Sequence, residues 1–205
     1  SNVLAVIVFG SFARGNSRSD SDIDLIVILN EGYSRTVEVF EDQPFEITYT
    51  TEGSAKEYWI QNKHDAAGLW SVGKVIFDRE GTGQRLEQFG KELLTQLPQK
   101  PDSATLTHLQ FDIEDSLRAV EALATTDPST ATLLLHKKMG TLLELYFDLT
   151  GAWRPAPKQQ IGLIKAADTE LGQLIEEFYL TKDFFTQITL AKDIYTKIFS
   201  GTIKI

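Results

Sequence analysis

The hydrophobic and polar positions of the first hundred residues alternate between short apolar runs and longer amphipathic stretches. Residues 4–9 and 23–29 are runs rich in Val, Ile and Leu, which is typical of buried strands. Residues 36–51 predict two further strands that meet at Asp42-Gln43-Pro44, where Asp and Pro favour a turn. The other expected elements are a strand at 74–77 and helices at 54–70 and 84–97. This mixture predicts an α+β fold in which a short mixed sheet packs on helices.

From residue 104 onward the pattern is that of helices alone. Asp127 and Pro128 suit the N-cap and the first position of a helix, and Gly151 suits the position just past its end. The expected helices are 104–124, 128–150, 161–167, 168–179 and 183–199. Two prolines make residues 97–103 the expected boundary. The sequence therefore predicts two domains, residues 1–98 with the sheet and residues 103–205 as a C-terminal helical bundle.

Composition and charge limit the kinds of partner and site that this protein can have. The chain has 205 residues, 42% of them hydrophobic, which is enough for one large domain or two small ones. A net charge of −9 argues against nucleic acid as a partner, because such binding needs a basic surface. The lack of cysteine excludes disulfides and thiolate metal sites and fits the cytoplasm. We expect no membrane span and no signal peptide, since the apolar runs are short and residues 3–9 lack a basic leader and a cleavage site.

The segment FGSFARGNSRSDSDIDLIVI, residues 9–28, concentrates the candidate chemistry. Asp22 and Asp24 are two positions apart at the start of an expected strand, so their side chains share one face. Carboxylates this close raise each other's pKa unless positive charge lies between them, and oxygen ligands favour Mg²⁺ or Mn²⁺. Upstream, Gly10 lets a phosphate approach the backbone, while Ser11 and the N–H groups of a following helix can bind it. This combination indicates a nucleoside triphosphate held by metal.

The spacing of these residues resembles the signature of the DNA polymerase β-like nucleotidyltransferase superfamily. Gly10-Ser11 is followed by ten residues and then Asp22-Ile23-Asp24, with Ala13-Arg14-Gly15 between them and Ser21 just before the acid pair. The motif is most similar to that of small bacterial members, the antibiotic and minimal nucleotidyltransferases. The resemblance implies that residues 1–98 have the nucleotidyltransferase fold, bind an NTP (expected to be ATP) and hold two Mg²⁺ ions, for which Mn²⁺ is an alternative.

The family pattern also requires a third carboxylate on a neighbouring strand, usually an aspartate. Glu46, between Phe45 and Ile47, is the acidic residue so placed. Glutamate is one methylene longer, so it is open whether Glu46 ligates metal, acts as the base for the acceptor hydroxyl, or is an exposed hairpin residue. The expected catalytic and metal-binding residues are therefore Asp22, Asp24 and Glu46. The expected nucleotide-binding residues are Gly10, Ser11, Arg14, Ser21 and Lys158, the last from across a cleft between the domains.

These residues predict transfer of a nucleoside monophosphate from an NTP to a hydroxyl group, with release of pyrophosphate. We expect the helical domain to bind the acceptor, and a small hydroxylated molecule such as an aminoglycoside is the first choice. Two alternatives stay open: an antitoxin-like enzyme that modifies a protein, and a catalytically weak nucleotide-binding regulatory module. The sequence leaves the identity of the acceptor and the oligomeric state open.

Overall fold

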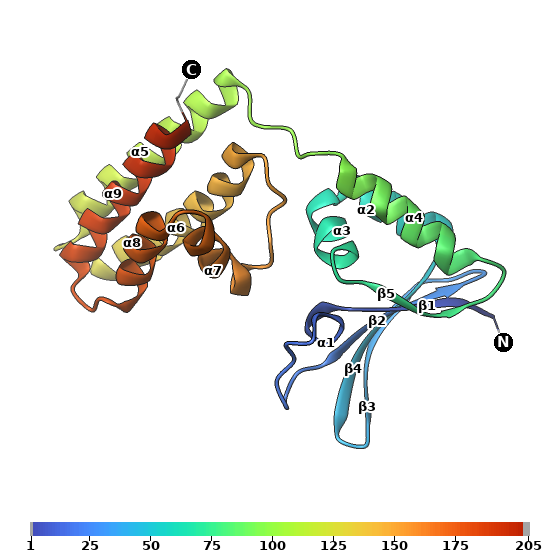
Figure 1. Cartoon of the computed structure of the whole chain (residues 1–205). Helices are drawn as coiled ribbons and strands as arrows, with labels where there is room; N and C mark the ends of the chain where they lie inside the picture. Colours follow the sequence, from blue (N-terminus) through green and yellow to red (C-terminus); the bar gives the residue numbers. More distant parts are fainter. Residues whose placement is uncertain (1, 203–205) are drawn as a thin grey trace. The chain divides into compact units, whose positions relative to one another are not determined.

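The computed structural model describes residues 2–202, with side chains through residue 200, and the chain forms two compact units (Figure 1). The first unit ends at Leu97 and the second begins at Pro98. The α+β fold class expected from the sequence is confirmed, since a mixed sheet with helices is followed by a region of helices alone. None of the helices in the described part of the chain is long and apolar enough to cross a membrane.

The first unit is built on a mixed sheet whose five strands lie in the order β3-β4-β2-β1-β5. Neighbouring strands are antiparallel except β2 and β4, which run parallel. The strands are β1 (Val3–Phe9), β2 (Ile23–Leu29), β3 (Ser34–Phe40), β4 (Gln43–Thr51) and β5 (Lys74–Asp78). β2 therefore lies in the middle of the sheet, between an antiparallel neighbour and a parallel one.

Helices α2 (Glu52–Gln61), α3 (Lys63–Trp70) and α4 (Thr82–Thr95) gather on one side of the sheet (Figure 1). They bury apolar strand residues against Trp59 and Trp70, whose rings pack edge to face with their centroids 5.2 Å apart. The core residues include Ile7, Ile26, Ile28, Trp59, Trp70 and Leu86. Burial of this one apolar face is the main reason that the sheet and helices form a single unit.

The prediction of a single helix at 54–70 was wrong, because the helix is interrupted at Asn62. Its backbone has ψ of 62°, outside the helical region. The backbone N–H and the side-chain amide of Asn62 donate to the Tyr58 carbonyl at 2.8 and 2.9 Å. The first is the last i→i−4 bond of α2, and after the non-helical backbone of Asn62 helix α3 starts at the next residue.

The turn between β3 and β4 begins one position earlier than predicted and has two residues instead of the three expected at Asp42-Gln43-Pro44. Glu41 and Asp42 have positive φ angles of 48° and 65° and form a two-residue hairpin turn, so that Phe40 faces Gln43. Pro44 is inside β4, just before Phe45, where the parallel ladder with β2 begins. Its missing N–H is therefore tolerated. This turn fixes which residues of β3 and β4 share a face.

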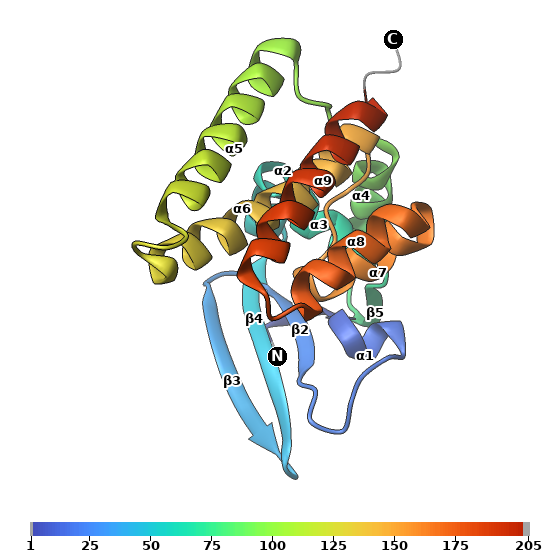
Figure 2. The same cartoon turned by 90° about the vertical axis from the view of Figure 1, so that its left-hand side faces the viewer.

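The second unit consists of helices, and the expected caps of its longest helix are confirmed. Asp127 accepts a hydrogen bond from the Thr130 N–H, Pro128 is at the helix start, and Gly151 ends the helix with φ of 72°. The helices are α5 (Ser103–Leu123), α6 (Pro128–Thr150), α7 (Pro157–Ala167), α8 (Thr169–Leu180) and α9 (Phe184–Thr202). In Figure 2, α8 lies between α7 and α9, and Met139, Phe178 and Ile194 are fully buried in the shared core.

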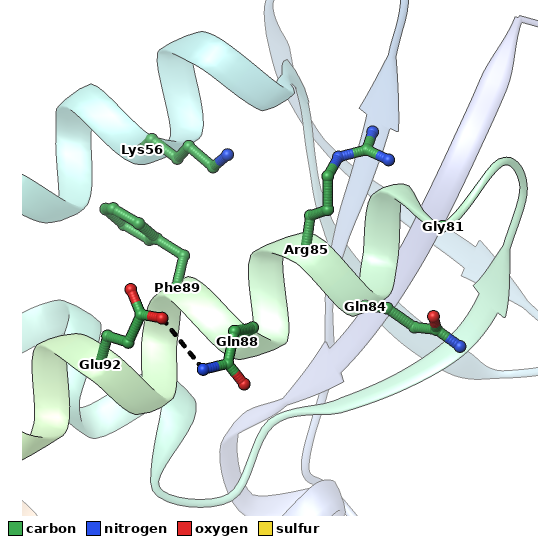
Figure 3. Close-up of a pocket in the computed structure, with 7 residues that line it drawn as sticks. All are labelled: Lys56, Gly81, Gln84, Arg85, Gln88, Phe89 and Glu92. Carbon is green, nitrogen blue, oxygen red and sulfur yellow. Dashed lines mark hydrogen bonds between the residues drawn. The ribbon is translucent and has the colours of Figure 1, made fainter.

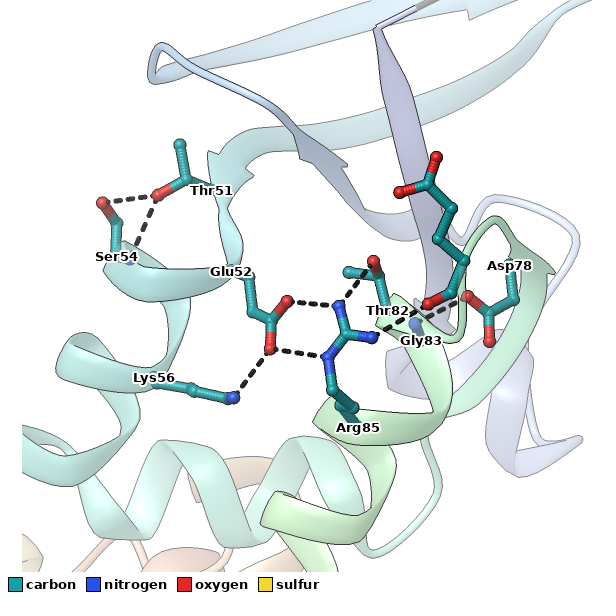
Figure 4. Close-up of polar contacts among 9 residues, drawn as sticks. Thr51, Glu52, Ser54, Lys56, Asp78, Thr82, Gly83 and Arg85 are labelled. Carbon is teal, nitrogen blue, oxygen red and sulfur yellow. Dashed lines mark hydrogen bonds and ion pairs between the residues drawn. The ribbon is translucent and has the colours of Figure 1, made fainter.

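A charged junction joins the end of β4 to α2 and α4 (Figure 4). Arg85 donates two hydrogen bonds to Glu52, at 3.2 and 2.8 Å, and Lys56 donates a third at 2.7 Å. The bonds from Arg85 are the main cause that lowers the pKa of Glu52 to about 2, and Lys56 adds to this against the opposing effect of burial. Arg85 also donates to the buried Thr82 hydroxyl at 3.0 Å. The junction therefore links the starts of two helices.

A surface depression of about 570 Å³ lies beside this junction, between α2 and α4 (Figure 3). Lys56 and Arg85 border it, but both are already paired with Glu52. Lys56 also lies 5.6 Å from the centre of the Phe89 ring, a cation–π contact. These contacts within the protein support a structural role for the depression.

The low pKa of Glu52 predicts a component of stability that disappears in acid. A depressed pKa in the folded state stabilises the protein above the unfolded pKa of about 4.3, and the contribution is lost as pH falls toward the folded value. We expect the difference in free energy of unfolding between wild type and Glu52→Gln to be largest at about pH 6 and to shrink toward about pH 2.5. Urea denaturation over this range measures it.

The matched control for this experiment is Glu57→Gln, which changes an exposed carboxylate of the same helix. It should show no comparable change between these pH values. A difference between wild type and Glu52→Gln that stays constant over the range would contradict the prediction.

Candidate active site

Three carboxylates meet where β2 begins, and strand pairing brings them there. Asp24 is level with Glu46 of β4 in the parallel ladder and with Phe9 of β1 in the antiparallel one. Residues that face each other across paired strands have side chains on the same face. Asp22 precedes Asp24 by two residues. One ligand oxygen from each of Asp22, Asp24 and Glu46 lies within 4.8 Å of the others.

The face that carries these acids is apolar further along β2. The alternation of side chains along a strand puts Asp24, Ile26 and Ile28 on one face. The two isoleucines belong to the core beneath the helices. Asp22 is exposed, whereas Asp24 and Glu46 are half-buried. The strand therefore changes from core to an accessible acidic surface within one side-chain repeat.

Gly10 lies against Asp24, and a side chain at position 10 would displace the Asp24 carboxylate. Its φ is +70°, and a Cβ placed on it would be only 1.7 Å from Asp24 Oδ2. Gly10 opens the short helix α1 (Gly10–Arg14), whose preceding residue gives no side-chain cap. Ser11, which follows, is only 9% exposed. The backbone of Gly10-Ser11 thus passes directly beside the acid cluster.

Arg35 is a residue at this site that the sequence analysis did not identify. It lies on β3, and its guanidinium donates a hydrogen bond to Glu46 Oε1. That hydrogen bond, more than the Coulomb attraction, raises the pKa of Arg35. The signal in the sequence is strand parity, but it depends on the hairpin register. A three-residue turn at Asp42-Gln43-Pro44, in place of the observed two-residue turn, would have put Arg35 and Glu46 on opposite faces.

The loop before β2 is held by its own hydrogen bonds. The Arg18 N–H donates to Ser21 Oγ at 2.9 Å, and Gln43 Nε2 donates to the Ser21 carbonyl at 2.8 Å. Arg18 also pairs with Asp20 at 2.8 Å, which lowers the pKa of that exposed carboxyl. Asp20 therefore pairs outside the acid cluster. Ser21 orders the loop that leads into Asp22.

Comparison with known proteins places this geometry in a family. The family model of the nucleotidyltransferase domain matches residues 1–123, which include the whole first unit and α5. The chain belongs to the nucleotidyltransferase family. It is therefore an enzyme of the nucleotidyl-transferring class, EC 2.7.7. The resemblance first seen in the spacing from Gly10 to Asp24 is confirmed.

A solved structure similar to this nucleotidyltransferase is that of a nucleotidyltransferase-like protein from Exiguobacterium sibiricum 255-15. The two chains are 15% identical, the match covers 98% of this chain and 69% of that chain, and the TM-score is 0.51. At this identity the similarity shows the fold. No curated protein sequence matches the chain.

The remaining candidates of the sequence analysis have different surroundings. Arg14 is half-buried in the last turn of α1, next to the Gly10-Ser11 segment of the nucleotidyltransferase unit. Lys158 is exposed at the start of α7, in the second unit. The nucleotide-binding roles of Arg14, Ser21 and Lys158 stay predictions.

The contact between Gly10 and Asp24 predicts an unusual cost for adding one methyl group. Gly10→Ala must accept a left-handed backbone and also displace the Asp24 carboxylate. Gly15→Ala is the matched control, because Gly15 has φ of +76° but nothing within 4 Å of an added Cβ. We expect Gly15→Ala to cost about 1–2 kcal/mol of unfolding free energy and Gly10→Ala to cost more. Urea denaturation measures both, and equal costs would show that Asp24 does not limit position 10.

Proposed function

We propose that this nucleotidyltransferase transfers AMP from ATP to a hydroxyl group of an acceptor and releases pyrophosphate. The observation that carries the proposal is the convergence of Asp22, Asp24 and Glu46, with ligand oxygens within 4.8 Å of one another. Membership of the family supports nucleotidyl transfer in general. The choice of ATP and of a hydroxyl acceptor is part of the proposal.

The three carboxylates suit a hard divalent cation. All three offer oxygen ligands, the type that Mg²⁺ and Mn²⁺ prefer. Neighbouring oxygen ligands of one Mg²⁺ would lie ~3 Å apart, so oxygens within 4.8 Å of one another need to move only by small side-chain rotations. We propose that Asp22 and Asp24 hold Mg²⁺, with two ions in the complete site. Bound there, the metal neutralises phosphate charge and makes the acceptor hydroxyl more acidic.

The chain's own residues supply positioning. Gly10 lies against Asp24, so the N–H groups of Gly10 and Ser11 and the Ser11 hydroxyl are proposed to hold the β- and γ-phosphates, with Arg14 as a further contact. The acceptor oxygen then forms a bond to the α-phosphorus while the bond to the β-phosphate oxygen breaks and pyrophosphate leaves. The hydroxyl proton goes to Glu46 if that residue is the base, and otherwise to solvent.

A small hydroxylated acceptor is the first choice, bound with the help of the helical unit. That unit contains a cavity of about 430 Å³, a volume within the usual range of ligand pockets. Its lining combines Tyr146, Asp168 and Lys197 with apolar side chains. Such a mixture suits a polar molecule that carries both hydroxyl and amino groups.

A polypeptide acceptor is the second candidate, and the edge strand β3 favours it. Val37 and Val39 are 69% and 68% exposed, and Val37 stands directly opposite Glu46. An edge strand with exposed apolar side chains can pair with an extended polypeptide. ATP labelled at the α-phosphate separates the candidates, because the label ends either on a small product or on a protein band.

The first test removes the acid pair. Asp22→Asn combined with Asp24→Asn should abolish the metal-dependent part of ATP affinity while the circular dichroism spectrum stays that of wild type. Calorimetric titration with ATP in Mg²⁺ and in EDTA measures this. Asp20→Asn, which changes an exposed neighbour paired with Arg18, is the control and should bind as wild type does. Tight ATP binding in EDTA that the double variant retains would refute the proposal.

The second test asks what Glu46 does, since Glu46→Gln keeps the size and removes the charge. If Glu46 is the base, affinity for Mg-ATP stays near that of wild type and single-turnover transfer falls by about 10²–10⁴-fold. If Glu46 is a metal ligand, affinity and transfer fall together. Wild-type values for both would make it an ordinary hairpin residue.

A further inference from the structure

Arg35 approaches the acid cluster from the edge of the sheet. In the antiparallel ladder Arg35 is opposite Thr48, and Glu46 is opposite Val37. Arg35 and Glu46 are therefore diagonal neighbours on one face, a separation that a long side chain spans. The guanidinium donates to Glu46 Oε1, an oxygen that a metal ion at the cluster would also use.

The exposed position of Arg35 allows its guanidinium to move away from Glu46. The Arg35 side chain is 64% exposed and the Glu46 side chain 28% exposed, so the arginine end of the pair lies largely in water. Such exposed pairs contribute little to stability. β3 has β4 on one side and forms the edge of the sheet, so the guanidinium can turn toward solvent without repacking the core.

We propose that Arg35 and a divalent metal are alternative partners of the Glu46 carboxylate. In the metal-free protein Arg35 neutralises Glu46 and holds its carboxylate toward Asp22 and Asp24. A divalent ion bound among the same oxygens repels the guanidinium, and Arg35 moves away as the metal takes its place. Arg35 is thus a positioning residue that lowers the metal affinity of the site. This inference rests on the proposed metal dependence of the transferase.

The experiment measures the dissociation constant for Mn²⁺ in the absence of nucleotide, from the electron paramagnetic resonance signal of free Mn²⁺. Arg35→Gln should bind Mn²⁺ about twofold to fivefold more tightly than wild type, the range expected from loss of an exposed ion pair. Arg18→Gln is the matched control, because Arg18 is also exposed but pairs with Asp20, and it should bind as wild type does.

A double-variant cycle separates exchange at Glu46 from simple charge repulsion. In the Glu46→Gln background, Arg35→Gln should leave Mn²⁺ affinity unchanged, because position 46 no longer carries a carboxylate for which Arg35 and the metal compete. The same tightening in both backgrounds would overturn the exchange, because charge would then act at a distance. Should Arg35→Gln not fold, Arg35→Lys replaces it and should tighten binding by a smaller factor, as lysine lacks the planar fork of arginine.

The outcomes also separate this inference from the proposed function. If wild type binds no Mn²⁺ at millimolar concentration, the proposed metal site itself fails. If wild type binds Mn²⁺ and Arg35→Gln binds it equally well or more weakly, the metal site stands and the role of Arg35 is refuted.

Discussion

Parallel pairing of β2 with β4 sets Asp24 level with Glu46, and the candidate active site depends on that register. Parallel neighbours usually require a long helical crossover. Here β3 makes the return instead, running antiparallel to β4 at the edge of the sheet. The two-residue turn at Glu41 and Asp42 then starts β4 beside the start of β2. Because a slip of one residue would turn Glu46 to the opposite face, this turn positions a carboxylate that it does not touch.

Three carboxylates at one place repel one another, and the local backbone and charge explain how the fold accommodates them. Gly10 leaves room that a side chain would fill, so the β1–α1 connection can pass against Asp24. Arg35 brings positive charge to Glu46 from the neighbouring strand. Partial exposure lets water screen the rest. The cluster is therefore tolerated in the free protein in a form that still favours a cation.

The sequence predicted the elements that local chemistry determines. Asp127, Pro128 and Gly151 bound α6 as expected, because caps act within one turn. The spacing from Gly10 to Asp24 identified the family, since a strand, a turn and an acid pair are close along the chain. The break at Asn62 and the pairing of Arg35 with Glu46 were missed. Both depend on choices between nearly equivalent local structures, which tertiary packing decides: a helix that continues or restarts, and a hairpin turn of two residues or of three.

The two ends of β4 place carboxylates in different surroundings, and the contrast separates a structural junction from the candidate site. Just after β4, Glu52 is a single carboxylate with two cations, Lys56 and Arg85, in contact with it. Near its start, Glu46 joins two further carboxylates, and Arg35 is the cation bonded to it. The first arrangement is electrically satisfied within the protein and joins two helices. The second brings three carboxylates close together, an arrangement that suits the divalent metal and the phosphate chain of the proposed function.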